Sequence, residues 1–303
     1  MKEDIIEVKE LTKDYKNNRG LFDLSFALKK GEFCGLIGEN GAGKSTLMRL
    51  LMGFIKPDKG HIYINGFEPF KNQETIKEYL GYVPGEINYP DLQKGNDFLK
   101  LQAEMDPSFN KDKANYLINK LQLDISAYPK RMSKGMKQKM AIVNAFAKNK
   151  EMYLLDEPTT GLDPLMREAF LELLEKEKEE GKAIFMSSNT FEEIERVCSR
   201  VIYISEGKIV TDIDISELNK ENLRVFKVKF SDIENFSHEK NVSEVFRCKE
   251  EKNELFYVIK KDDINRFLKR ISAYKINGIS EYSFSLKEYM DSKLRAEHGK
   301  KKE

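Results

Sequence analysis

Two patterns of apolar residues alternate along the first 220 residues of this chain. Short apolar runs, typical of buried strands, are separated by segments with apolar residues at steps of three and four, typical of helices. The strand-like segments lie at 5–9, 21–28, 32–37, 61–65, 80–84, 152–156, 183–188, 201–205 and 208–210. The helix-like segments lie at 44–52, 98–105, 114–123, 134–148 and 164–182. The alternation predicts an α/β domain over residues 1–220 with a mixed, largely parallel sheet. The helical stretch between its two halves predicts a helical subdomain over about 90–148.

Polar residues indicate where two of these helices begin. Ser133 and Asp163 are suitable N-caps, and Pro164 suits a first helical turn. The helix after Asp163 ends in the charged run 175–182, which we expect to be exposed to solvent.

Residues 221–303 follow a different pattern. Apolar and polar residues alternate at 223–230, 243–249 and 254–260, as in strands with one buried face. A helical segment follows at 261–272 and a last strand at 276–284. With a short helix near 231–238, this order predicts a small α+β domain of the ferredoxin-like kind. Residues 286–303 are expected to form a C-terminal amphipathic helix that ends in a basic tail.

Composition and charge exclude some classes of function. The 52 basic and 51 acidic residues nearly cancel, so charge does not favour nucleic acid as a partner. The three cysteines are far apart, which favours neither a zinc site nor a disulfide framework. The N-terminus lacks the apolar core of a signal peptide, and no 18-residue window is apolar enough to span a bilayer. We therefore expect a cytoplasmic protein that reaches the membrane only through a partner.

The segment GENGAGKST at 38–46 fits the phosphate-loop pattern G-x-x-x-x-G-K-[ST]. Glycines allow consecutive N–H groups to point at a polyphosphate, and the following helix directs its positive dipole end there. The alternative is a chance match, against which the flanking strand and helix argue. The residues predicted to bind the nucleotide are Gly38, Glu39, Asn40, Gly41, Ala42, Gly43, Lys44, Ser45 and Thr46. Lys44 would contact the outer phosphates, and the Ser45 hydroxyl would ligate Mg²⁺.

Four further motifs follow the phosphate loop. They are MSKGMKQK at 132–139, MYLLDEP at 152–158, GLDP at 161–164 and MSSNTFEEIE at 186–195. In this order they resemble the ATP-binding subunit of a bacterial ABC transporter, over residues 1 to about 220. The segments GYVPGE (81–86) and SKGMKQK (133–139) are similar to the corresponding segments of a branch of drug and antibiotic exporters.

The resemblance implies roles for individual residues. Asp156 would hold Mg²⁺, and Glu157 would polarise the attacking water as the general base. The alternative for Glu157 is a plain surface carboxylate. In the head-to-tail dimer of the family, Ser133 and Gly135 would face the γ-phosphate bound by the other subunit, and Asp163 would contact that subunit.

Tyr15, between the first two strands, has two interpretations. It maps onto the aromatic residue that stacks on adenine in the family. It is otherwise an exposed tyrosine of a hairpin.

Two positions depart from the family. Gly85 stands where most members carry a glutamine that touches Mg²⁺, and Asn189 where they carry a histidine that contacts the γ-phosphate. Asparagine keeps a neutral hydrogen bond but cannot become a cation, and a charge-assisted bond is roughly twice as strong. We include Asn189 with Glu157 among the catalytic residues and predict intact ATP binding with slow hydrolysis. The segment MSKGMKQK resembles the LSGGQ signature of the family and is called the signature segment below. Lys134, in place of the first glycine of that signature, is a milder change.

Three functions remain in competition. The first is an ATPase that powers export of a small molecule through a separate membrane permease. The second is a hydrolysis-impaired half of a heterodimer, which Asn189 favours and Glu157 opposes. The third is a non-transport ATP switch, although the chain lacks the second ATP module or coiled-coil insertion typical of such relatives. For the first function, residues 92–128 would dock on the permease. The alternative is that the aromatic and apolar residues of this segment, Phe98, Leu101 and Tyr116, mostly belong to the internal core.

Overall fold

The computed structural model describes residues 3–90, 94–220, 222–231, 245–251 and 254–290 of the 303-residue chain. The chain divides into two compact units, Met1–Ile213 and Asp214–Glu303. The boundary proposed from the sequence, at residue 220, lies inside the second unit.

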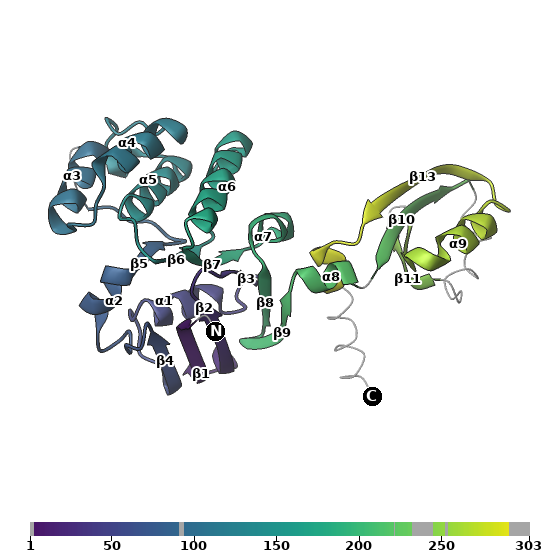
Figure 1. The fold of residues 1–303 in the computed structure, drawn as a ribbon, viewed down its shortest axis with the longest axis horizontal. Helices are drawn as coiled ribbons and strands as arrows, with labels where there is room; N and C mark the ends of the chain where they lie inside the picture. The colour runs from purple at the N-terminus through teal and green to yellow at the C-terminus, as the bar shows by residue number, and fades with distance from the viewer. Residues whose placement is uncertain (1–2, 91–93, 221, 232–244, 252–253, 291–303) are drawn as a thin grey trace. The chain divides into compact units, whose positions relative to one another are not determined.

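A six-stranded sheet forms the centre of the first unit (Figure 1), in the order β5-β6-β7-β3-β8-β9. Its strands are β3 (Phe33–Ile37), β5 (Leu80–Val83), β6 (Met152–Asp156), β7 (Ala183–Ser188), β8 (Arg200–Ser205) and β9 (Lys208–Asp214). The first five pair in parallel, and β9 follows β8 through a turn at Glu206–Gly207. Every residue of β3, β6 and β7 is buried, which explains their continuous apolar runs. The predicted largely parallel sheet is confirmed.

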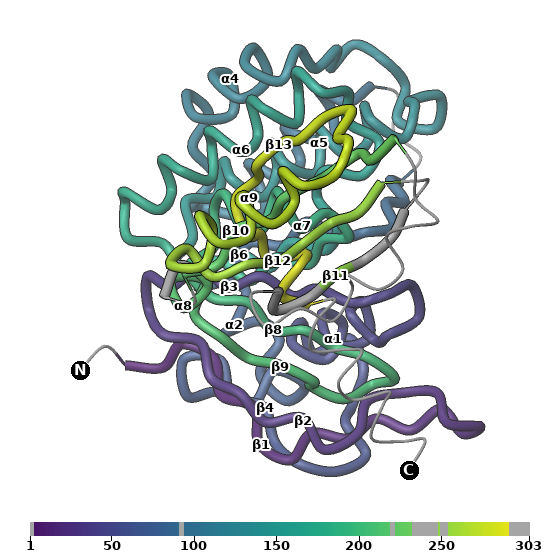
Figure 2. Tube along the Cα trace, turned by 90° about the vertical axis from the view of Figure 1, so that its right-hand side faces the viewer, coloured from purple at the N-terminus to yellow at the C-terminus, as the bar shows by residue number. Residues whose placement is uncertain are grey.

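A second sheet of the first unit is antiparallel, in the order β2-β1-β4. It consists of β1 (Asp4–Asp14), β2 (Gly20–Lys29) and β4 (Lys59–Ile64). In Figure 2 these three strands lie below β3, β8 and β9 of the large sheet, and α4, α5 and α6 lie above it. In Figure 1, α3, α4, α5 and α6 likewise lie above the large sheet. The helices of the first unit are α1 (Lys44–Leu51), α2 (Gln73–Tyr79), α3 (Gly95–Met105), α4 (Lys111–Lys120), α5 (Lys134–Phe146), α6 (Pro164–Glu179) and α7 (Phe191–Val197), with a 3₁₀ turn at Pro129–Arg131.

The charged end of α6 is not wholly exposed, contrary to the prediction. Glu177 is only 1% exposed, and its carboxylate pairs with Lys113 Nζ of α4 at 2.5 Å. Lys120 and Glu172 form a second ion pair between the same two helices. A run that looks uniformly polar thus contains one buried acid, which is paired with a lysine of another helix.

Two apolar residues of the helical segment are more exposed than predicted. Phe98 is buried, but Leu101 is 38% exposed and Tyr116 is 45% exposed. The interpretation of all three mainly as core was therefore wrong for two of them. The amphipathic pattern predicted the helices correctly but not how much of each apolar face its neighbours cover.

The second unit contains a four-stranded antiparallel sheet in the order β11-β12-β10-β13. Its elements are α8 (Ser216–Lys220), β10 (Leu223–Phe230), β11 (Val245–Glu251), β12 (Glu254–Lys260), a 3₁₀ turn at Lys261–Asp263, α9 (Ile264–Ile271) and β13 (Ile276–Ser283). One strand separates β10 from β11, and one separates β12 from β13, which is the split arrangement of the predicted ferredoxin-like order. The predicted helix near 231–238 falls almost entirely outside the described residues. Of the predicted C-terminal helix, the structure describes residues 286–290, which are helical.

None of the helices in the described part of the chain is both long enough and apolar enough to cross a membrane. The three cysteines are free thiols; Cys34 and Cys198 are buried.

Candidate functional site

The phosphate loop joins β3 to α1 at the carboxyl end of the central sheet. A Cβ at Gly38 would lie 2.4 Å from the backbone oxygen of Ile204, so only glycine fits there. Gly43 caps α1 in the left-handed region, with φ of 109°. The chain thus turns directly into a helix N-terminus, where backbone N–H groups and the helix dipole favour an anion.

Lys44 lies at the centre of the site and is only 5% exposed. Its Nζ donates hydrogen bonds to the backbone oxygens of Gly38 and Glu39, at 2.7 and 3.2 Å, and to Asn189 Oδ1 at 2.8 Å. Burial lowers the pKa of Lys44, and the nearby carboxylates of Glu157 and Asp156 oppose that effect.

Asn189 connects this lysine to Glu157. While its Oδ1 accepts from Lys44, its Nδ2 donates to Glu157 Oε1 at 2.9 Å. Lys44 Nζ and Glu157 Oε1 are themselves 3.7 Å apart. A protonated histidine at position 189 would have no acceptor for the lysine, whereas an asparagine amide provides both donor and acceptor. The structure therefore brings together three residues that the sequence analysis treated separately.

Glu157 follows β6 with φ of 48°, a conformation that is uncommon for a residue with a side chain. Its backbone N–H is held by Ser187, through the hydroxyl Oγ at 2.9 Å and the backbone oxygen at 3.2 Å. Its side chain is 27% exposed and bonded to Asn189. These contacts do not fit a plain surface carboxylate.

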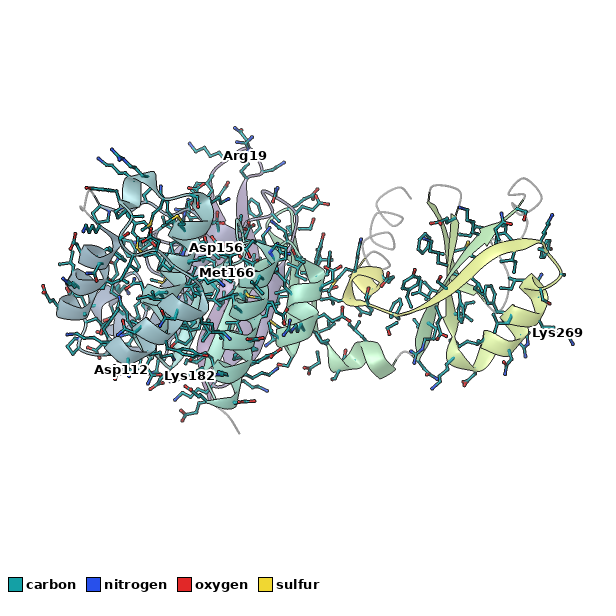
Figure 3. All side chains as sticks on the ribbon, turned by 90° about the horizontal axis from the view of Figure 1, so that it is seen from above. Arg19, Asp112, Asp156, Met166, Lys182 and Lys269 are labelled. Atoms are coloured by element: carbon teal, nitrogen blue, oxygen red, sulfur yellow. The ribbon has the colours of Figure 1, made fainter. Side chains whose placement is uncertain are left out.

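Asp156, which is labelled in Figure 3, is the last residue of β6. It is 3% exposed. Its Oδ1 accepts a hydrogen bond from Ser187 Oγ at 2.7 Å. A Cβ at Gly85 would lie 3.0 Å from Oδ2, so the missing side chain leaves room beside that oxygen. A carboxylate with space beside one oxygen fits Mg²⁺, as does the exposed Ser45 hydroxyl. No group of three or more metal-ligating side chains occurs in the described part of the chain. Mg²⁺ does not require a group of three such side chains where phosphate oxygens supply further ligands.

The signature segment packs against the GLDP loop of the same subunit. Ser133 caps α5 by accepting a hydrogen bond from the Met136 N–H at 3.2 Å, as predicted. A Cβ at Gly135 would lie 2.4 Å from the backbone oxygen of Gly161. Asp163 caps α6 by accepting from the Met166 N–H at 3.0 Å, also as predicted.

Tyr15 lies in the turn between β1 and β2, and its side chain is 50% exposed. Lys13 Nζ is 5.8 Å from the centre of its ring. The end of this turn meets the phosphate loop, because a Cβ at Gly43 would contact Leu21 and the Gly20 oxygen. Both interpretations of Tyr15 require an exposed ring, so stacking on adenine stays a prediction.

Two residues that support the site were not predicted from the sequence. Ser187 bonds to both acids of the site, as given above. Glu193 is 3% exposed and accepts hydrogen bonds from Thr159 and Ser188. The helical spacing of Glu193 with the apolar Ile194 and Val197 could have indicated that it lies on the buried face of α7.

Comparisons with known proteins agree with this geometry. A family model described as ABC transporter matches residues 21–160. The ABC transporter ATP-binding protein YtrB of Bacillus subtilis is 30% identical over 239 residues, covering 78% of this chain and 82% of YtrB. The bacitracin transport ATP-binding protein BcrA of Bacillus licheniformis is 34% identical over 231 residues, covering 75% of this chain and 76% of BcrA. The dimeric post-hydrolysis structure of the ATP-binding cassette MJ0796, bound to ADP and Pi, superposes with a TM-score of 0.62 at 25% identity, covering 69% of this chain and 98% of that one.

This chain belongs to the ATP-binding subunits of ABC transporters, a family of ATPases. Members of the family bind ATP and ADP, form dimers and act with membrane permeases.

Proposed function

We propose that this chain hydrolyses ATP to drive export of a small molecule through a separate membrane permease. The observation that carries the proposal is the network of Lys44, Asn189 and Glu157, which joins the phosphate loop to the candidate base. The substrate class follows from BcrA, whose name assigns it to bacitracin transport. The export direction rests on the segments GYVPGE and SKGMKQK, which are similar to those of exporters.

Each residue of the network has a distinct task in this proposal. Lys44 stabilises negative charge on the outer phosphates, and Glu157 accepts a proton from the attacking water at its carboxylate. Asp156 and Ser45 would hold Mg²⁺, which when bound neutralises phosphate charge. Asn189 orients Glu157 but adds no positive charge of its own.

The neutral residue at position 189 is why we propose slow turnover. Loss of one transition-state contact typically costs 10²–10³ in rate. Starting from a median turnover of about 10 s⁻¹, this gives roughly 0.01–0.1 s⁻¹. The same observation supports the second candidate, a hydrolysis-impaired half of a heterodimer.

We further propose that ATP joins two subunits head to tail. Ser133 is exposed at the N-terminus of α5, where its hydroxyl and the N–H of Gly135 are suited to an anion. In the dimer they would contact the γ-phosphate bound by the other subunit, with Asp163 beside them.

The permease would dock in a groove of about 460 Å³ between α2 and β5 on one side and α3 and α5 on the other. Met105, at its edge, is 70% exposed, and Tyr82 and Met52 also line it. Mixed charges from Lys77, Glu78 and other side chains surround these apolar groups, as in the polar rim of a protein interface. Through this partner the chain would lie at the cytoplasmic face of the membrane.

Light scattering of the Glu157→Gln variant tests the dimer. One subunit has a mass of 35.2 kDa. We expect the measured mass to double when ATP and Mg²⁺ are added and to stay at one subunit with ADP. Ser133→Ala should weaken the ATP-dependent dimer, because it removes a γ-phosphate contact made between subunits. A mass that stays at one subunit with saturating ATP contradicts a homodimer. In that case, recovery of a second ATP-binding subunit with the tagged chain from membranes supports the heterodimer.

A further inference from the structure

Ser187 connects the two acids at the end of β6. It lies opposite Asp156 in the parallel pairing of β6 with β7 and is wholly buried. Its hydroxyl donates to Asp156 Oδ1 at 2.7 Å and accepts from the Glu157 N–H at 2.9 Å.

These two bonds determine which oxygen of Asp156 faces the site. A serine hydroxyl has one proton, and Ser187 uses it on Oδ1. Oδ2 then faces the space that Gly85 leaves beside it. Because Gly85 has no side chain, it supplies no metal ligand of its own. A metal ion at this site would therefore depend more heavily on the orientation of Asp156.

The same hydroxyl supports the backbone of Glu157. The φ of Glu157 is 48°, which is unfavourable for a residue with a side chain. Such conformations persist only where the surrounding structure holds them. Ser187 does so with its hydroxyl and with its backbone oxygen.

We propose that Ser187 is a positioning residue that orients Asp156 toward Mg²⁺ and fixes the backbone from which Glu157 acts. This proposal rests on the proposed function, in which Asp156 holds the metal. Partners that orient metal ligands typically contribute 10–100-fold to metal affinity or activity. The effect of Ser187 on nucleotide binding should therefore depend on Mg²⁺ and not on the phosphate loop.

Nucleotide affinity with and without Mg²⁺ tests this role without relying on turnover. The measurement uses the Glu157→Gln background, so that ATP is not consumed; the backbone N–H bonded to Ser187 is retained there. In calorimetric titrations, Ser187→Ala should weaken ATP binding 10–100-fold when Mg²⁺ is present. It should leave ATP binding unchanged when EDTA removes Mg²⁺.

Ser188→Ala is the matched control, because this serine is also buried and also donates to a carboxylate, Glu193 Oε2 at 2.8 Å. It should lower the melting temperature by a similar amount but keep the Mg²⁺-dependent affinity. In an Asp156→Asn background, Ser187→Ala should have no additional effect, since both changes then act on the same contact.

Two results would overturn the proposal for Ser187: an unchanged affinity with Mg²⁺, or an equal loss with EDTA. Failure of the proposed function gives a different result. In that case Glu157→Gln itself turns over ATP like the unmodified chain, before any change at Ser187 is made.

Discussion

Replacement of Gly135 by alanine adds one methyl group at the junction of the signature segment and the GLDP loop. That methyl carbon would lie 2.4 Å from the backbone oxygen of Gly161. Ordinary van der Waals contact begins about 1 Å further out. The clash is with backbone, so one of the two segments must move by about that distance.

The expected loss of activity follows from this displacement. A misplacement of 1 Å in catalytic geometry can cost about 10²-fold in rate. We expect Gly135→Ala to reduce ATP turnover by about that factor, because Ser133 and Asp163 shift with the two segments. ATP binding to the separate subunit should be retained, since the phosphate loop is not changed.

The melting temperature of the variant gives a second readout. It should fall if the added methyl group clashes with the GLDP loop, and rise if that methyl group meets open space. In open space, alanine in place of glycine in a helix stabilises it by up to about 1 kcal/mol. Overpacking instead costs about 1–3 kcal/mol. At 2–4 °C per kcal/mol for a unit of this size, the melting temperature should fall and not rise.

The assay compares turnover and Tm of Gly135→Ala with those of Gly278→Ala. Gly278 has no atom within 4 Å of its would-be Cβ, so alanine there should change neither quantity. A Gly135→Ala variant with raised Tm and unchanged turnover would refute the close packing of the two segments.

Three further outcomes are expected. Met105→Glu should weaken recovery of the chain with its membrane partner and leave basal turnover unchanged; equal recovery would contradict docking in the groove. Burial raises the pKa of Cys198 to about 12, so at pH 8 a thiol reagent should label the half-buried Cys248 and not Cys198 until the chain unfolds; mass spectrometry of the labelled chain would show any early reaction of Cys198. Burial also raises the pKa of Glu177, against the influence of Lys113. A carboxyl with a raised folded pKa loses stability as pH rises from the unfolded value, about 4.3, through the folded value. Denaturant titrations at pH 4.5 and 7 should therefore show Glu177→Gln gaining stability relative to the unmodified chain as pH rises, and a difference independent of pH would contradict this.

The sequence predicted the elements around the nucleotide because each depends on local patterns. The glycines of 38–46, the apolar strand before Asp156 and the caps Ser133 and Asp163 all have signals within a few residues. The order of these motifs was enough to identify the family.

The contacts that join these elements could not be predicted in the same way. Lys44 and Asn189 are 145 positions apart, and Asp156 and Ser187 are 31 apart. Such pairs depend on which strands lie next to each other and in which register, and a single sequence does not specify either. The buried Glu177 could not be predicted for the same reason, since nothing in its charged run indicates that Lys113, 64 positions earlier, pairs with it.

ATP turnover tests the central claim most directly, measured for the unmodified chain beside Glu157→Gln and Asn189→His at saturating ATP and Mg²⁺. We expect slow hydrolysis by the unmodified chain, none by Glu157→Gln although it binds ATP, and faster hydrolysis by Asn189→His. Turnover by Glu157→Gln at the rate of the unmodified chain would contradict the role of Glu157 as the base. An unmodified chain that already turns over at about 10 s⁻¹, the median for enzymes, would contradict the slow hydrolysis attributed to Asn189.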